Sequence, residues 1–255
     1  MRDLIQYLDD VTSASSVDEV WKLHAARMGH YGFDRLLYGF TRYSGTSNFG
    51  DPSDWIVLST QTPEYMQYYF GDGHFKNAPM LRWASENNGA CSWRIVEDLE
   101  RTGALTEGER KMLEFNRSMG VTAGYTISFR SVSARTKGAI ALTARSSMSQ
   151  DQVEEIWSEH GCAIHMMNNV MHLKLLTLPH SGERRLTRRQ REVLQWIGDG
   201  KSVQDTALLL GLTPATVEKH LRLAREALGV ETTPQAVMKA TLSNQMFVED
   251  SGETV

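Results

Sequence analysis

The feature that most constrains the fold of this chain is the stretch 200–228, GKSVQDTALLLGLTPATVEKHLRLAREAL. Ala207, Gly211 and Val217 have the spacing of two short helices joined by a tight turn at a steep angle. A small residue lets the helices approach closely, Gly adopts the positive φ of the turn at little cost, and a β-branched residue packs the second helix against the first. The pattern therefore predicts a helix-turn-helix whose second helix lies on DNA.

The predicted boundaries of the second helix agree with this interpretation. Thr213 can cap its N-terminus, with Pro214 at the first helical position and Gly229 at the end. One predicted face is apolar and recurs at i, i+4, i+7 and i+11: Val217, Leu221, Ala224 and Leu228. The charged side chains lie on other faces: Glu218, Lys219, Arg222 and Arg225. The alternative interpretation is a surface helical hairpin with a solvated charged face.

Charge is distributed unevenly along the chain. Residues 184–230 carry nine Lys and Arg against five Asp and Glu, a net charge of +4 in a chain whose total is −4. Residues 1–183 carry a net charge of −5. Phosphate contacts require the local basic excess, so we expect nucleic acid to bind the C-terminal part and not the acidic N-terminal part.

Several classes of protein are disfavoured by what the sequence lacks. No apolar run is long enough to span a membrane, and the N-terminus lacks the basic start and apolar core of a signal peptide. Cys91 and Cys162 form no CxxC motif, which suits a reducing cytoplasm. GxSxG, Walker, HExxH and GxGxxG motifs are absent, and His160 and His165 are five residues apart. We therefore expect a cytoplasmic protein that is not an enzyme, with no catalytic residues, no metal site and no membrane partner.

The first two thirds of the chain alternates helical and strand patterns. The predicted strands are 35–43, 55–59, 124–131 and 138–144, and the last two form a hairpin around a turn at 131–137. The predicted helices are a pair within 1–31, short helices starting near 62 and 77, one at 107–119 and a long one at 149–178. This order predicts a sheet with helices on both sides.

Residues 61–93 are the most aromatic part of the chain. Tyr65 and Tyr69 lie four residues apart on one helical face, and Phe75, Trp83 and Trp93 follow. Rings that carry O–H and N–H groups suit a mainly apolar cavity that orients a small amphipathic ligand. The alternative is that these rings only fill the core.

The C-terminal part resembles the LuxR family of quorum-sensing transcription regulators over residues 186–245. The matching residues are Leu186-Thr187, Arg189, Glu192-Val193-Leu194, Trp196, Gly200-Lys201-Ser202, Ala207, Thr216-Val217, His220-Leu221, Leu228-Gly229-Val230 and Ala236. The resemblance implies a four-helix domain that binds double-stranded DNA as a dimer, with Thr213 and Thr216 near phosphates and Glu218 and Arg222 facing base edges. Lys201 and Lys219 complete the predicted DNA-binding set. Gln190, Leu223 and Ala227 depart from the family pattern and put the phosphate contacts in question.

The N-terminal part resembles the autoinducer-binding domain of the same family over residues 61–142. The family's pocket has a Trp, a Tyr, an Asp-Pro pair, a second Trp and a Gly, and here Tyr69, Pro79, Trp93 and Gly124 match. Tyr65 replaces the first Trp, Ala78 replaces the Asp that accepts the ligand's amide N–H, and Ala141 stands where many members have Ser. Without this acceptor, the amide N–H of a bound acyl-homoserine lactone stays buried and unpaired, which weakens binding by about 1–3 kcal/mol. Asn77 is a candidate substitute, and Phe75, Trp83 and Thr126 complete the predicted ligand-binding set.

The expected fold class is therefore α+β: an N-terminal α/β/α sandwich with a central, mainly antiparallel sheet, and an all-α four-helix C-terminal domain. The expected domains are a ligand-binding and dimerisation domain at 1–178, a linker at 179–185, the helix-turn-helix domain at 186–245 and a flexible tail at 246–255.

The leading hypothesis is a DNA-binding regulator, homodimeric through the helix at 149–178. Either a small amphipathic ligand controls it or it acts as a ligand-independent orphan. The resemblance suggests an acyl-homoserine lactone, whereas Ala78 suggests a non-standard signal; no other cofactor is expected. The alternative is a regulator that binds no small molecule and heterodimerises with another receptor of this type.

Overall fold

The computed structural model describes residues 2–42, 54–71, 73–131, 133, 135–179 and 186–247. The chain divides into two compact units, Met1–Leu175 and Leu176–Val255, and each unit is described by itself. Most of the predicted linker, residues 180–185, and most of the predicted tail, residues 248–255, lie outside the described residues.

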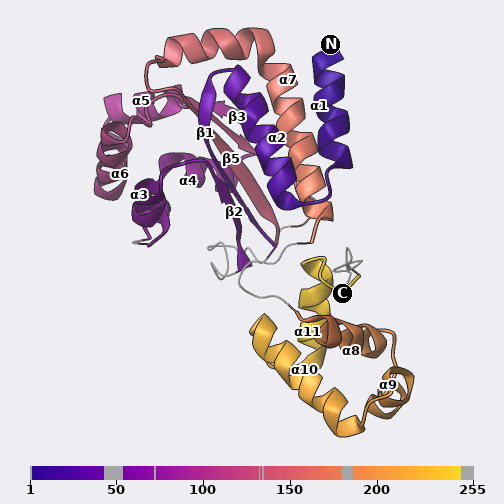
Figure 1. Ribbon diagram of the computed structural model, residues 1–255. Helices are drawn as coiled ribbons and strands as arrows, with labels where there is room; N and C mark the ends of the chain where they lie inside the picture. Colours follow the sequence, from indigo (N-terminus) through magenta and orange to yellow (C-terminus); the bar gives the residue numbers. More distant parts are fainter. Residues whose placement is uncertain are drawn as a thin grey trace. The chain divides into compact units, whose positions relative to one another are not determined.

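The first unit is built on a five-stranded sheet with the order β2-β1-β5-β4-β3 (Figure 1). Its strands are β1 Phe33–Thr41, β2 Ile56–Ser59, β3 Gly89–Ser92, β4 Gly124–Ser128 and β5 Lys137–Ala144. All neighbouring strands pair antiparallel, which confirms the predicted sheet and the β4–β5 hairpin. Strand β3 was not predicted, because four residues that include Gly and Ser carry little strand signal.

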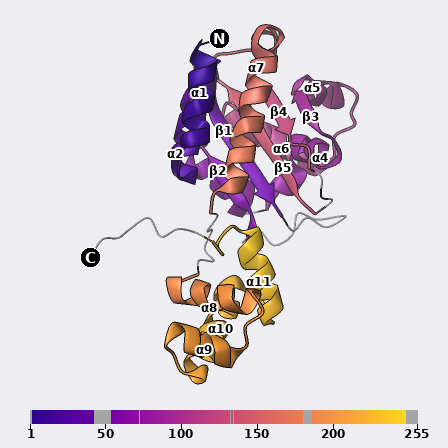
Figure 2. The ribbon, with the colours of Figure 1, turned by 90° about the vertical axis from the view of Figure 1, so that its right-hand side faces the viewer.

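Helices cover both faces of this sheet (Figures 1 and 2). One layer contains α1 Arg2–Ser13, α2 Val17–His30 and α7 Gln150–Thr177. The other contains α3 Pro63–Met66, η2 Gln67–Gly71, η3 His74–Asn77, α4 Pro79–Glu86, α5 Arg94–Arg101 and α6 Glu107–Ser118. The predicted α/β/α sandwich is therefore confirmed. Among the described residues, no helix combines the length and the hydropathy needed to cross a membrane.

The two faces of the sheet differ in the size of their side chains, because successive residues of a strand point to opposite faces. Tyr38, Ile140 and Leu142 are fully buried on the face toward α7. There the Tyr38 hydroxyl lies 2.9 Å from Nδ1 of His172, a residue of α7. Towards the other helical layer the same strands present smaller residues, among them Gly39 and two alanines, which leave space above the sheet.

The second unit consists of α8 Arg188–Gly198, α9 Val203–Leu210, α10 Pro214–Leu228 and α11 Thr233–Leu242. Gly211 ends α9 with φ of 65° and Gly229 ends α10 with φ of 63°, the left-handed conformation that Gly adopts without steric cost. Thr213 caps α10 by accepting a hydrogen bond from the backbone N–H of Thr216. These features confirm the helix-turn-helix.

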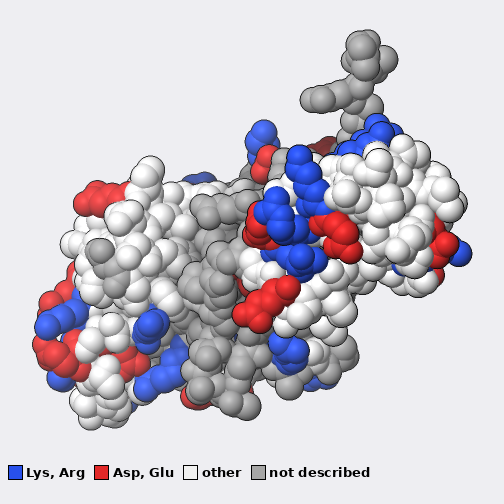
Figure 3. Space-filling view, turned by 90° about the horizontal axis from the view of Figure 1, so that it is seen from below, with Lys and Arg blue, Asp and Glu red and all other residues white. Residues whose placement is uncertain are grey.

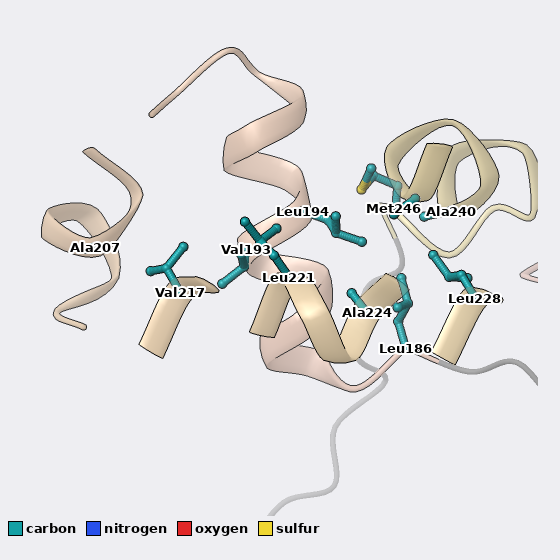
Figure 4. Close-up of a cluster of buried hydrophobic side chains, with 11 residues drawn as sticks. Leu186, Val193, Leu194, Ala207, Val217, Leu221, Ala224, Leu228, Ala240 and Met246 are labelled. Atoms are coloured by element: carbon teal, nitrogen blue, oxygen red, sulfur yellow. The ribbon is translucent and has the colours of Figure 1, made fainter. Parts of the chain in front are cut away.

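The core of the second unit lies between its helices (Figure 4). Ala207 from α9 and Val217 from α10 are both buried, as the spacing argument requires. The predicted apolar face of α10 is buried in full: Val217, Leu221, Ala224 and Leu228. Gln190, a departure from the family pattern, forms a capping box at the start of α8 with Thr187. Its amide oxygen thus satisfies the free backbone N–H of Thr187 at 2.8 Å.

Candidate ligand cavity and DNA-binding helix

A cavity of about 380 Å³ lies between the sheet and the layer of helices that contains α3 to α6. Seven of the eight residues predicted to bind a ligand line it: Tyr65, Tyr69, Phe75, Ala78, Trp93, Thr126 and Ala141. The aromatic stretch therefore encloses a cavity and does not only fill the core. A volume of this size is in the range of small-molecule sites.

Trp83 is the exception. This residue lies on α4 but is not part of the cavity lining, and its side chain is only partly buried. Leu81 and Ala84, which also lie on α4, line the cavity instead. The structure therefore does not bring Trp83 to the cavity, and its role in ligand binding stays a prediction.

The sheet forms the floor of the cavity, and its residues were not predicted apart from Thr126 and Ala141. Strand pairing places Leu37 opposite Ala141 and Ala141 opposite Thr126, so these three residues form one row across the sheet. Gly39 and Ala139 form the next row. A hypothetical Cβ on Gly39 would meet no atom within 4 Å, which shows that the space above it is empty.

Aromatic rings form one wall of the cavity. Tyr65 and Tyr69 stack with their centroids 5.7 Å apart, and Trp55 packs edge-on against Phe75 at 5.1 Å. The Tyr65 hydroxyl donates a hydrogen bond to Oδ1 of Asn116 at 3.1 Å. Burial raises the pKa of both tyrosines above the ordinary value, so both hydroxyls stay protonated. The wall thus offers two uncharged hydroxyl groups to a ligand, with the Tyr65 O–H already donated to Asn116.

Trp93 is held in place by the strands on which it packs. Its indole N–H donates to the Thr126 hydroxyl at 2.9 Å, and its backbone N–H donates to the Gly124 carbonyl at 3.1 Å. A Cβ on Gly124 would lie 2.2 Å from the Leu142 carbonyl oxygen and 3.2 Å from the Trp93 ring. Only Gly fits there, which explains why a glycine accompanies this tryptophan.

Ala78 contributes no polar side-chain group to the cavity. It precedes α4 and is 8% exposed, with its side chain in the lining. Asn77 does not replace the missing acceptor, because it is absent from the lining and its Oδ1 lies 2.5 Å from where a Cβ of Gly108 would be. The Asn77 amide is thus directed toward α6, and the expectation that it substitutes for an aspartate is wrong.

Four charged side chains line the cavity: Glu97, Glu100, Arg117 and Lys137. Glu97 pairs with Arg94 at 3.6 Å, and Glu100 pairs with Arg117 at 3.0 Å. Lys137 instead donates to the backbone carbonyl of Asn87 at 2.9 Å. Sequence reasoning assigned Lys137 to a turn, whereas the structure places it in the first position of β5.

The residues predicted to bind DNA are on the accessible side of the helix-turn-helix. Lys201, Thr213, Glu218, Lys219 and Arg222 are exposed, and Thr216 is partly buried. The Thr213 and Thr216 hydroxyls lie 2.9 Å apart at the N-terminus of α10, where free backbone N–H groups favour phosphate oxygens. Glu218 and Arg222 are four residues apart and share one face of α10.

Ion pairs within the second unit reduce the basic excess that charge counting gives. Arg188 and Arg189 both pair with Glu192, at 3.0 and 2.7 Å, and Arg222 pairs with Glu226. Lys219 forms no ion pair with any residue that the structure describes.

On the face drawn in Figure 3, basic side chains gather in a compact group bordered by acidic ones. All three pairs are solvent-exposed at least in part, so DNA phosphates can replace their carboxylates at small cost.

Comparison with known proteins matches both parts of the chain to one family of regulators. The family model "Autoinducer binding domain" matches residues 16–175, and the model "Bacterial regulatory proteins, luxR family" matches residues 184–240. The transcriptional activator protein AnoR of Acinetobacter nosocomialis is 23% identical over 243 residues, which cover 92% of this chain and 96% of AnoR. The quorum-sensing regulator RhlR of Pseudomonas aeruginosa is 27% identical over 158 residues, 58% of this chain and 64% of RhlR.

Solved structures share the fold at low sequence identity. CepR2 of Burkholderia cenocepacia, an N-acylhomoserine lactone dependent factor, is 15% identical with a TM-score of 0.53, covering 68% of this chain and 93% of its own. SdiA in complex with octanoyl-rac-glycerol is also 15% identical, with a TM-score of 0.52 and coverage of 94% of this chain and 93% of SdiA.

Proposed function

Because the chain belongs to the luxR family and is a quorum-sensing transcription regulator with an autoinducer-binding domain, we propose that a small amphipathic molecule in its cavity controls DNA binding by α10. The observation that carries this proposal is the cavity itself, walled by Tyr65, Tyr69 and Trp93. The alternative, a regulator that binds no small molecule and heterodimerises with another receptor, does not require such a cavity. Like its DNA target, the protein would act in the cytoplasm.

The ligand we propose is not a standard acyl-homoserine lactone. Ala78 offers no acceptor for an amide N–H, and the Asn77 amide is directed elsewhere. Burying that N–H unpaired costs about 1–3 kcal/mol, or about 5- to 150-fold in affinity. A ligand without an amide N–H at this position avoids this cost. The fold accommodates such molecules, since SdiA binds octanoyl-rac-glycerol, an ester without an amide.

We propose that the active form is a homodimer that packs through α7. Cys162, Met166 and Leu173 lie at i, i+4 and i+11 on this helix, so they share one face. Met166 is 52% exposed and Leu173 is 62% exposed, an unusual exposure for large apolar side chains two turns apart on one helical face. Sedimentation of the full chain tests this: Leu173→Glu should yield monomers, whereas a dimer of unchanged affinity would contradict the assignment.

At the DNA, we propose that the N-terminus of α10 and Lys201 contact phosphates, while Glu218 and Arg222 contact base edges in the major groove. Two copies would place two such helices in successive major grooves of a near-palindromic site. The domain limits proposed here are 1–178 for ligand and partner, and 186–245 for DNA.

The experiment that tests the proposed function is DNA binding by the full chain, with and without an organic extract of spent culture medium. Sequences selected from a random DNA pool supply the operator. We expect the extract to change operator affinity at least about tenfold, as a ligand with differential affinity for two states does. Equal affinity in both conditions would contradict control by a small molecule.

A further inference from the structure

The cavity has a positively charged end that its aromatic wall does not explain. Residues 137, 139, 141 and 143 of β5 alternate with the buried Ile140 and Leu142, so Lys137 points to the same face of the sheet as Ala139 and Ala141. Strand pairing places Lys137 opposite Thr41, at the C-terminal end of β1 and four residues from Leu37 in the cavity floor. The ammonium group therefore lies at one end of the cavity.

The charge of Lys137 has no carboxylate partner within the described part of the chain. The other charged lining residues form ion pairs, whereas Lys137 donates only to the Asn87 carbonyl and, at 3.5 Å, to Oδ1 of Asn88. An ammonium group has three N–H donors, so one donor is left for another group. Burial lowers the pKa of Lys137, as it does when no anion offsets the loss of water.

The distance between the two polar ends sets the length of a ligand that reaches both. Lys137 and Ala141 are four residues apart on β5, or about 13 Å at about 3.3 Å per residue. Ala141 pairs with Thr126, which holds the Trp93 indole. Extended backbone covers about 3.3 Å with three covalent bonds, so a chain of about twelve bonds spans this distance. Small residues, Gly39 and Ala139, line the path between the ends.

We infer that the cavity binds an elongated amphiphile whose terminal carboxylate pairs with Lys137 and whose uncharged polar end reaches Tyr69 and the Thr126 hydroxyl beside Trp93. This inference rests on the proposed function, because it names the ligand class of the same cavity. It distinguishes this chain from a receptor for an uncharged acyl chain, whose tail would place a methyl group against the ammonium.

The test compares two probes that share one chain and differ at one end, 10-hydroxydecanoic acid, which is a carboxylate at pH 7, and its uncharged methyl ester. Each is titrated calorimetrically into the full chain at pH 7, and the ratio of the two affinities is the readout. We expect the wild-type chain to bind the acid about tenfold or more tightly than the ester, since a charge-assisted hydrogen bond replaces a neutral contact. In Lys137→Met this preference should disappear, and in Lys137→Arg it should persist.

The affinity ratio within each variant is independent of small changes in its stability. Lys111→Met is the matched control, because Lys111 is exposed on α6 and pairs with Glu107 outside the cavity; it should keep the wild-type ratio. Equal ratios in wild type and Lys137→Met, or a wild-type chain that binds the ester as tightly as the acid, would overturn the inference and leave the proposed function standing. A wild-type chain that binds neither probe would contradict the cavity as a site for chains of this length, and the inference with it.

Discussion

Gly39→Leu should block the cavity at its floor without disturbing the sheet. No atom lies within 4 Å of a Cβ at this position, and Gly39 pairs in register with both Val57 and Ala139. Replacing Leu by Ala in another protein core leaves a cavity of about 150 Å³. A new Leu side chain at Gly39 should therefore remove about 150 Å³ of the 380 Å³ cavity. Burial of a Leu side chain stabilises the folded state by about 1.5–3 kcal/mol. Replacing a glycine in the middle of a strand adds about 0.5–1 kcal/mol, because Gly loses more backbone entropy on folding.

We therefore expect Gly39→Leu to abolish binding of the 10-hydroxydecanoate methyl ester, measured by calorimetry, while the free energy of unfolding in urea stays equal or rises by about 1–3 kcal/mol. Gly29→Leu is the control, because it also meets no neighbour within 4 Å but lies in α2, outside the cavity lining. It should bind the ester like wild type. Undiminished ester binding by Gly39→Leu would show that the space above Gly39 is not the binding site. A loss of more than about 1 kcal/mol of stability would show that this space does not accommodate a Leu side chain.

The remaining predictions concern Ala78, Arg222 and two buried histidines. Ala78→Asp should supply the missing acceptor and tighten binding of N-decanoyl homoserine lactone about 5- to 150-fold in calorimetry; unchanged affinity would show that an amide N–H never reaches this position. Arg222→Ala should abolish the specific operator footprint and change the unfolding free energy by less than about 1 kcal/mol, because its pair with Glu226 is exposed. An unchanged footprint would refute the base contact, and Arg101→Ala, an exposed arginine of α5, is the control. Burial lowers the pKa of His24 and of His172 to about 4, below the ordinary value of 6.5, so the unfolded chain binds more protons between these values. The stability these histidines contribute is complete above pH 6.5 and is lost as pH falls toward 4, up to about 3 kcal/mol each. Urea unfolding at pH 7, 5.5 and 4.5 should show this decline, and a flat profile would contradict it.

The helix-turn-helix could be predicted from the sequence because local interactions determine it. The Thr213 cap, the left-handed Gly211 and the buried face of α10 each depend on residues within one or two turns. The aromatic wall of the cavity was predictable for the same reason, since Tyr65 and Tyr69 are four residues apart in one helical segment.

The floor of the cavity could not be predicted, because it depends on the pairing of strands far apart in the chain. Gly39 lies beside Ala139 only through the β1–β5 register, and a shift by one residue would turn both away. The direction of the Asn77 side chain likewise depends on a distant residue, Gly108 of α6. Lys137 was missed for a related reason. The sequence predicts a solvent-exposed lysine beside a turn, and only the pairing of β5 with β1 shows that its side chain lies on the cavity face of the sheet.

The measurement that tests the central claim most directly is native mass spectrometry of the full chain purified from cells grown with spent-medium extract. We predict one bound small molecule per chain in the wild type and none in Gly39→Leu, whose new side chain occupies the floor of the cavity. A wild-type chain that carries no small molecule and binds its operator equally well with and without the extract would contradict the account.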